Sequence, residues 1–323
     1  MSKLWGVRCY EIPGDQVKIG SLCTGYGGLD MAVEAYFNAE TVWVSEIDKY
    51  ASQVIDQRIG KPNLGDLKVI NWAEVEPIDI LTAGYPCQPF SHAGLRKGTD
   101  DERHLWPYIL KGISELRPNY VILENVRGHL SLGFKDVLAN LTEIGYNATW
   151  QVVRASDVGA PHQRARLFII AYPDSFNGGI SPSSEPVTDS SNCRCTQGNT
   201  CRSEQTIPKF ASDGCTADSH GCTRTQSRRA CTCVHGAPSE IINRSNRQIN
   251  RFSREMDRQA VPDTLDQGRL NARFVEYMMG LPEGWVTDCD LTRTQQLKIL
   301  GNGVVPQQAY HAISLIMDTV NNL

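Results

Sequence analysis

Residues 18–30, with the sequence KIGSLCTGYGGLD, decide the fold. The start of this stretch predicts a short strand, which ends in a glycine-rich loop and leads into a helix running from Met31 to Phe37. Glycine lets the backbone turn tightly and approach a ligand closely, and the helix amide groups stand behind such a loop. Many strand-to-helix turns are rich in glycine for packing reasons alone. The loop therefore indicates a ligand site only in combination with further polar residues nearby.

Two acidic residues follow the next strand-like segments. The apolar run Thr41–Val44 ends near Glu46, about 20 residues after the glycine loop, where an acid can bind a ribose diol. Asp66 follows a further short segment and is suited to accept a hydrogen bond from an adenine amino group. Each acid alone is more often a solvated or helix-capping group, but the two together indicate a nucleoside-bearing cofactor.

Residues 78–91, IDILTAGYPCQPFS, carry the best candidate for a reactive group. The run Ile78–Ala83 predicts a buried strand, and the loop after it leaves the carboxyl end, where open α/β sheets place their reactive groups. Cys87 is therefore placed like a nucleophile. The alternative for Cys87 is a free cysteine packed as a small hydrophobe.

These loops, together with three later segments, resemble the ordered motifs of the DNA (cytosine-5)-methyltransferase family. The later segments are Glu124-Asn125-Val126 after the strand Tyr120–Leu123, then APHQRARLF at 160–168, then GNGVVP at 301–306. The resemblance covers the first half of the chain and its C-terminal end. It implies S-adenosylmethionine as cofactor and a doubly wound, mostly parallel α/β sheet of the Rossmann-like methyltransferase type, with a smaller, loop-rich target-recognition domain.

The predicted catalytic residues are Cys87, Glu124, Arg164 and Arg166. Carbon 5 of cytosine is a poor nucleophile, and attack of the Cys87 thiolate on carbon 6 would make the ring electron-rich. Glu124 would then hydrogen-bond to or protonate ring nitrogen 3. Arg164 and Arg166 alternate at the start of the strand Leu167–Ala171. They are therefore expected to point to one face and hold the base carbonyl, the phosphate or the glutamate.

The residues expected to contact the cofactor come from the glycine loop, the acidic segments, the loop around Cys87 and the C-terminal segment: Cys23, Gly25, Tyr26, Gly27, Gly28, Glu46, Ile47, Asp66, Leu67, Gly84, Pro86, Leu105, Asn302 and Val304. The family usually has an adenine-stacking aromatic residue where this chain has Cys23. Cofactor affinity is therefore expected to depend more on Glu46, Ile47 and Asp66. The spacing of apolar residues over Tyr310–Val320 predicts a helix packed on the sheet.

The charge distribution predicts where nucleic acid binds. The chain has 323 residues and a formal net charge of −4. Residues 192–258, however, carry eleven Lys or Arg against six acids, which leaves −9 for the remainder. This basic segment is where phosphate contacts with double-stranded DNA are expected. The residues expected to bind DNA are Gln88, Ser91, Arg224, Arg228 and Arg229.

The domain organisation follows the same composition change. Residues 1–172 are expected to form the catalytic and cofactor-binding domain, 173–267 the target-recognition domain, and 268–323 a segment that completes the catalytic domain. Seven of the eleven cysteines fall between Cys193 and Cys233. A zinc site could stabilise such a loop-rich module. The spacings are not those of common zinc ribbons, so we favour scattered thiols in a linker and assign no metal.

The sequence leaves three functions to compare. DNA cytosine-5 methylation is favoured. Cytosine methylation in transfer RNA is the second, but the long recognition segment argues against it, and the third, a non-catalytic DNA-binding protein, is disfavoured by the complete catalytic set. No apolar run approaches the ~20 residues of a membrane span and no signal-peptide pattern is present, so a cytoplasmic location in a bacterium or phage-infected host is expected. We expect a monomer, with a cognate restriction endonuclease as a candidate partner.

Overall fold

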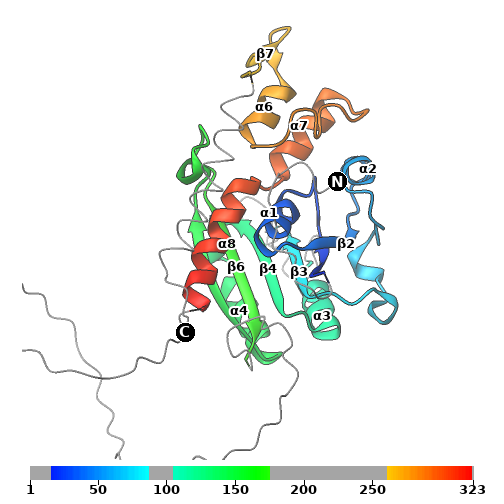
Figure 1. Cartoon of the computed structure of the whole chain (residues 1–323), viewed down its shortest axis with the longest axis vertical. Coiled ribbons are helices and arrows are strands. Elements are labelled where there is room, and N and C mark those ends of the chain that lie inside the picture. The colour runs from blue at the N-terminus through cyan, green and yellow to red at the C-terminus, as the bar shows by residue number, and fades with distance from the viewer. Residues whose placement is uncertain (1–15, 87–104, 175–259, 322–323) are drawn as a thin grey trace, which may run out of the picture. The chain divides into compact units, whose positions relative to one another are not determined.

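A six-stranded sheet forms the centre of the computed structural model, which describes residues 16–86, 105–174 and 260–321 (Figure 1). All of them belong to one unit of the chain. The strands are β1 Lys18–Leu22, β2 Glu40–Ser45, β3 Ile80–Gly84, β4 Tyr120–Val126, β5 Tyr146–Val153 and β6 Arg166–Pro173. Their order in the sheet is β2-β1-β3-β4-β6-β5. The first four strands are parallel, whereas β6 runs antiparallel to both β4 and β5.

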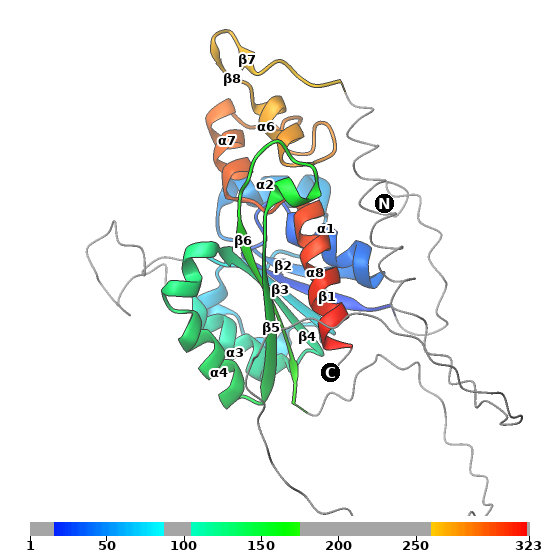
Figure 2. The same ribbon diagram turned by 90° about the vertical axis from the view of Figure 1, so that its left-hand side faces the viewer.

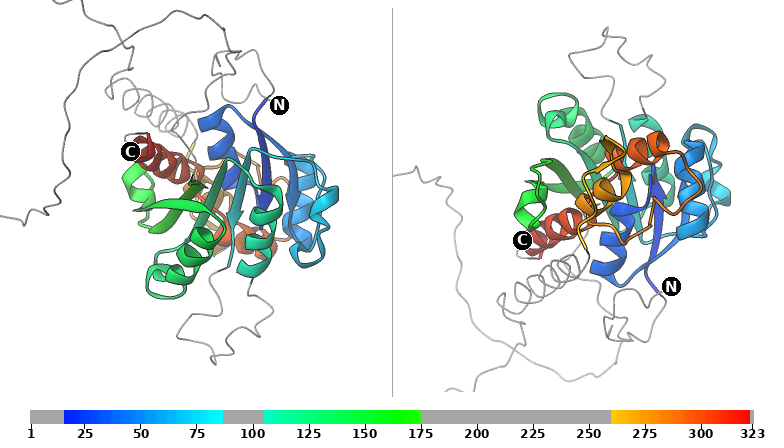
Figure 3. Two further views of the ribbon diagram at one scale, coloured as in Figure 1. Left: turned by 90° about the horizontal axis from the view of Figure 1, so that it is seen from below. Right: turned by 90° about the horizontal axis from the view of Figure 1, so that it is seen from above.

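Helices cover both faces of this sheet. The helices of the described residues are α1 Gly28–Phe37, α2 Lys49–Arg58, α3 Trp106–Leu116, α4 Phe134–Glu143, α6 Ala272–Met278, α7 Arg293–Asn302 and α8 Pro306–Val320. Helices α1 and α8 lie on one face, and α3 and α4 lie on the other (Figure 3). The predicted doubly wound α/β fold is confirmed, with antiparallel pairing at one side of the sheet.

Strand β4 shows why two helical layers form. Val121 and Leu123 pack in one apolar core with α3 and α4, whereas Tyr120 and Ile122 pack in a second core with α1 and α8. Successive side chains of a strand point to opposite faces, so the continuous apolar run Tyr120–Leu123 needs cover on both sides. β4 is buried from Tyr120 to Asn125, which satisfies this requirement.

The C-terminal segment begins with a short hairpin, β7 Leu265–Asp266 and β8 Arg269–Leu270, and continues through α6 and α7 (Figure 2). Its apolar residues pack with Tyr26 of the glycine loop and Val54 of α2. The buried Glu276 carboxylate organises the turn after α6, because it accepts hydrogen bonds from the backbone amides of Gly284, Val286 and Thr287. The hairpin crosses the expected boundary at residue 267. The predicted domain limits remain a prediction, since most of 173–267 lies outside the described residues.

Helix α8 provides a test of this packing. Ile316 is buried against the sheet, whereas its neighbour Leu315 is 39% exposed. We expect Ile316→Ala to lower the free energy of unfolding by about 2–5 kcal/mol, because it removes buried methyl groups and leaves a cavity. Leu315→Ala is the matched control and should cost less than about 1 kcal/mol. Urea unfolding measures both, and equal losses would contradict the packing of α8 on the sheet.

Candidate active site

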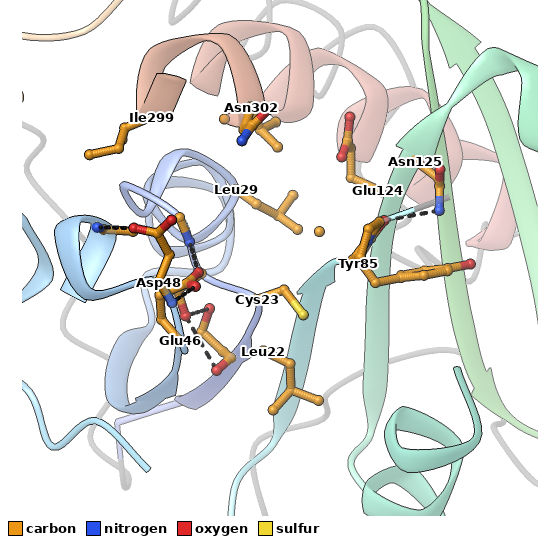
Figure 4. Close-up of a pocket in the computed structure, with 18 of the residues that line it drawn as sticks. Leu22, Cys23, Leu29, Glu46, Asp48, Tyr85, Glu124, Asn125, Ile299 and Asn302 are labelled. Atoms are coloured by element: carbon orange, nitrogen blue, oxygen red, sulfur yellow. Dashed lines mark hydrogen bonds between the residues drawn. The ribbon is translucent and has the colours of Figure 1, made fainter. Parts of the chain in front are cut away.

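A cavity of about 450 Å³ lies at the carboxyl ends of β1, β2, β3 and β4. Glu46 and Asp48 lie on one side of it, Glu124 and Asn125 lie on the opposite side, and Cys23 lies between them (Figure 4). Ile299 and Asn302 of α7 complete the wall. Parallel strands bring their carboxyl ends to one edge of a sheet, which is where ligands bind in open α/β folds.

The glycine loop needs its glycines for backbone geometry and for space. Gly25 and Gly27 have φ angles of 60° and 86°, in the left-handed region that disfavours other residues. A Cβ on Gly28 would lie 2.1 Å from the carbonyl oxygen of Val304. Glu46 braces this loop, since its Oε2 accepts a hydrogen bond from the Gly25 amide at 2.9 Å and its Oε1 accepts one from the Asp48 amide at 2.9 Å.

Glu124 and Arg166 form an ion pair in the cavity wall. The Arg166 Nε donates to Glu124 Oε1 at 3.0 Å, and the side chains are only 19% and 9% exposed. Burial raises the pKa of Glu124 to about 7, although the guanidinium groups of Arg166 and Arg164 act in the opposite direction. A carboxyl group with this pKa can hold or release a proton near neutral pH, which general acid–base catalysis requires.

Arg164 has a different role from Arg166. Its Nη2 donates to the carbonyl oxygens of Gly301 at 2.9 Å and Gly303 at 2.6 Å. β6 begins at Arg166, and Arg164 has a φ angle of 33°, so the strand alternation that we expected for the two arginines does not extend to position 164. Arg164 therefore fastens the C-terminal segment beside the cavity.

Tyr85 fixes the backbone that leads to position 87. Its carbonyl oxygen accepts a hydrogen bond from Asn125 Nδ2 at 3.1 Å, and its hydroxyl lies 3.0 Å from His129 Nε2. Pro86, the next residue, lines the cavity. The predicted nucleophile Cys87 lies outside the described residues, as do Gln88, Ser91, Arg224, Arg228 and Arg229.

Most of the expected cofactor residues line the cavity: Cys23, Gly25, Glu46, Ile47, Gly84, Pro86, Leu105, Asn302 and Val304. Five do not. Tyr26 is fully buried, and its hydroxyl donates to the Val304 carbonyl at 2.7 Å. Gly27 and Gly28 support the turn, Asp66 caps the following short helix by accepting from the Lys68 amide, and Leu67 is a buried core residue.

Several charged and polar residues of the wall were not among those predicted from the sequence: Ser21, Thr24, Asp30, Asp48, Asn125 and Lys298. Asp30 follows the glycine loop directly, and Lys298 lies one turn before Gly301. Both residues could have been proposed from the sequence, because each lies next to a motif from which we predicted the site.

Two negative findings apply to residues 16–86, 105–174 and 260–321 only. In that part of the chain, no cluster of three or more His, Cys, Asp or Glu side chains could hold a metal ion. The cysteine-rich segment on which the zinc question rests lies outside it. None of the helices described there has both the length and the apolar character needed to cross a membrane.

Comparison with known proteins places the chain in a family. Its residues 17–317 match the family model described as C-5 cytosine-specific DNA methylase. The chain is 28% identical over 308 residues to the Type II methyltransferase M1.ScrFI of Lactococcus lactis subsp. cremoris, an alignment that covers 92% of this chain and 77% of the relative.

Other relatives match over shorter stretches. The Type II methyltransferase M.BsuFI of Bacillus subtilis is 35% identical over 159 residues, which are 47% of this chain and 39% of the relative. For M.HhaI of Haemophilus parahaemolyticus the identity is 35% over 161 residues, or 48% of this chain and 49% of the relative. The chain thus spans about half the length, or less, of such relatives.

Solved structures support the fold. The S. pombe Dnmt2 methyltransferase has a TM-score of 0.58 at 17% identity, covering 95% of this chain and 100% of that one. The Entamoeba histolytica methyltransferase EhMeth has a TM-score of 0.57 at 16% identity, covering 96% and 99%. The match of the family model over nearly the whole chain, together with the buried Glu124 and the glycine loop, shows that the protein belongs to the C-5 cytosine-specific DNA methylase family.

Proposed function

We propose that this protein transfers a methyl group from S-adenosylmethionine to carbon 5 of cytosine in a specific site of double-stranded DNA. The observation that carries the proposal is the buried Glu124–Arg166 pair. It lies in the wall of a nucleoside-sized cavity, beside the backbone that leads to Cys87. A proton-holding carboxyl group and a candidate thiolate at position 87 are the two groups that methylation at carbon 5 needs.

The cavity fits the proposed cofactor. Its volume of about 450 Å³ is in the range of small-molecule sites. Glu46 offers carboxylate oxygens to a ribose diol, and the glycine loop offers close backbone approach at the start of α1. When bound, the cofactor supplies an electrophilic methyl group.

The protein side chains carry the remaining chemistry. The Cys87 thiolate would form a bond to carbon 6 of a flipped cytosine, and Glu124 would give its proton to ring nitrogen 3 as negative charge moves there. Arg166 holds Glu124 in place and offers positive charge beside the ring. After methyl transfer to carbon 5, a water molecule would accept the proton at that carbon, and the electron pair left behind would break the bond between carbon 6 and sulfur and release the thiolate. Ring nitrogen 3 would return its proton to Glu124, which leaves neutral 5-methylcytosine and the enzyme in its starting state.

The finer biological assignments rest on the relatives and on charge. Relatives named Type II methyltransferases support a restriction endonuclease as a candidate partner. The basic stretch 192–258 supports DNA contact by a target-recognition domain within 173–267. A DNA substrate is consistent with the cytoplasm of a bacterial or phage-infected cell. We further propose that the protein acts as a monomer.

Incubation with cofactor labelled in its methyl group, and with either duplex DNA or transfer RNA, tests the proposal directly. We expect label in DNA as 5-methylcytosine at one sequence, located by bisulfite sequencing. Cys87→Ser is the control and should abolish transfer, because a hydroxyl is far less nucleophilic than a thiolate at neutral pH. Label in transfer RNA alone, or none in either substrate, would overturn the proposed function.

The pKa of Glu124 predicts a pH dependence. Its protonated form is present below about pH 7 and is lost above it, because burial raises the pKa to about 7. The single-turnover rate should therefore fall as the pH rises through this value. Glu124→Gln should slow the reaction by ~10²–10⁴-fold and remove this fall, the descending limb of the pH–rate profile. Glu115→Gln, at an exposed position of α3, should keep both the rate and the limb. A descending limb that persists in Glu124→Gln would exclude Glu124 as its source.

The basic segment gives a separate prediction. Replacing residues 191–258 with a short Gly/Ser linker should abolish sequence-specific DNA binding and flatten the salt dependence of any residual binding, because phosphate-contacting arginines are lost. Cofactor binding, measured by calorimetry, should remain. Retained methylation of the parent site with parent selectivity would show that this segment does not read DNA.

A further inference from the structure

Asp30 is a buried carboxylate in the cavity wall that the proposed chemistry does not use. It lies in the first turn of α1, directly after the glycine loop, and is only 3% exposed. Thr82 Oγ1 of β3 donates a hydrogen bond to Asp30 Oδ1 at 2.5 Å, and the Ser21 hydroxyl of β1 provides another. Neutral donors thus hold the carboxylate between two central strands.

Among the described residues, the charges of the cavity wall leave Asp30 without a cation. The charged side chains of residues 16–86, 105–174 and 260–321 that line the cavity are Asp30, Glu46, Asp48, Glu124, Arg166 and Lys298. Arg166 pairs with Glu124 at 3.0 Å, and Lys298 pairs with Asp48 at 2.7 Å. Glu46 accepts two backbone amide hydrogen bonds. In the described part of the chain, no basic side chain forms an ion pair with Asp30. A buried carboxylate in this state stabilises a cationic ligand group.

The sheet order indicates which part of the cofactor reaches Asp30. Glu46 follows β2 at one side of the cavity, and Glu124 belongs to β4 at the other. A ribose at Glu46 and a methyl group near Glu124 place the sulfur atom between them, toward β1 and β3. The amino-acid chain of the cofactor is attached to this sulfur. Asp30 is held by residues of these two central strands, and the amide groups at the start of α1 lie next to it.

We propose that Asp30 binds the α-ammonium group of the amino-acid end of S-adenosylmethionine, an assignment that rests on the proposed function. The N-terminus of α1, a ten-residue helix, favours the carboxylate of the same amino acid. The two groups together would recognise the zwitterion. The alternative role of Asp30 is purely structural, as a link between α1 and β3 through Thr82.

Calorimetry with three neutral-sulfur ligands separates these roles. S-adenosylhomocysteine carries the α-ammonium group, its des-amino analogue lacks that group, and methylthioadenosine lacks the whole amino-acid end. We expect Asp30→Asn to weaken the binding of S-adenosylhomocysteine by roughly tenfold to a hundredfold, as for a lost charge-assisted hydrogen bond. The other two ligands should change by less than about threefold, because neither has a cation for Asp30.

Two control variants keep the test specific. Glu34→Gln removes a second part-buried acid of α1, one turn further on, which accepts hydrogen bonds from Thr41 and does not line the cavity. It should leave all three affinities unchanged. Thr82→Val removes the link to β3 but keeps the Asp30 carboxylate, so the preference for the ligand with the ammonium group should persist. Equal losses for all three ligands in Asp30→Asn, or loss of the preference in Thr82→Val, would assign Asp30 the structural role.

The unaltered protein allows a further test, which does not depend on the correct folding of any variant. Burial raises the pKa of Asp30 to about 6, and the neighbouring Glu34 acts in the same direction, whereas the hydroxyls of Thr82 and Ser21 act against it. The preference for S-adenosylhomocysteine over its des-amino analogue should shrink as the pH falls through this region. The ratio cancels effects of Glu124 and of other groups common to both ligands. A preference independent of pH between 5 and 8 would contradict the inference.

The outcomes also separate this inference from the proposed function. Failure of the parent protein to bind either S-adenosylmethionine or S-adenosylhomocysteine would overturn the cofactor assignment. Tight binding of both by the parent, with no selective loss in Asp30→Asn, would leave the function intact and reject only the role of Asp30.

Discussion

The register between β4 and β6 is the constraint on which the candidate active site depends. Val126 of β4 pairs with Arg166 of β6, and Glu124 lies two residues before Val126 on the same face. The guanidinium group of Arg166 therefore reaches the Glu124 carboxylate across the strand pair. A shift of one residue would turn Arg166 to the opposite face and leave Glu124 buried without its partner, at a substantial cost in free energy.

The second constraint is the close approach of the C-terminal segment to the glycine loop. The Val304 carbonyl oxygen accepts a hydrogen bond from the Tyr26 hydroxyl, and a Cβ at Gly303 would collide with the Tyr26 ring. Arg164 binds the carbonyl oxygens on either side of Asn302. These contacts join residues that are more than 130 positions apart in the chain, so residues 301–304 can complete a cavity that begins with β1.

Much of the parallel half of the fold could be predicted from the sequence, because its strands are apolar runs that end at glycine or acidic residues. The expected segments 41–44, 78–83 and 120–123 fall within or overlap β2, β3 and β4. β5 was missed, since it is an edge strand whose exposed Asn147, Trp150 and Gln151 interrupt the apolar pattern. The antiparallel direction of β6 depends on tertiary pairing with β4 and leaves no mark in its composition.

The site residues show the same division, between features that the local sequence determines and features that depend on tertiary contacts. Glu124, Glu46 and the glycine loop were predicted because they follow strand ends in sequence, and the structure brings them to one cavity. The role of Arg164 was not predictable, because it depends on a positive φ angle and on carbonyl groups far along the chain. The assignment of Asp66 to adenine stays a prediction; the structure shows that Asp66 also caps the short helix that follows it, a role that the sequence did not indicate.

The distribution of charge within the cavity explains why neutral donors matter as much as ion pairs. Glu124 keeps a raised pKa beside Arg166 because burial outweighs the attraction of the guanidinium group. Asp30, held by hydroxyl groups, also has a raised pKa, for the same reason of desolvation. The two carboxyl groups nevertheless differ in whether a basic side chain of the described residues forms an ion pair with them. Glu124 has its cation, Arg166, within the described part of the chain, whereas Asp30 is held by hydroxyl groups. This difference is why we propose proton transfer for Glu124 and ligand binding for Asp30.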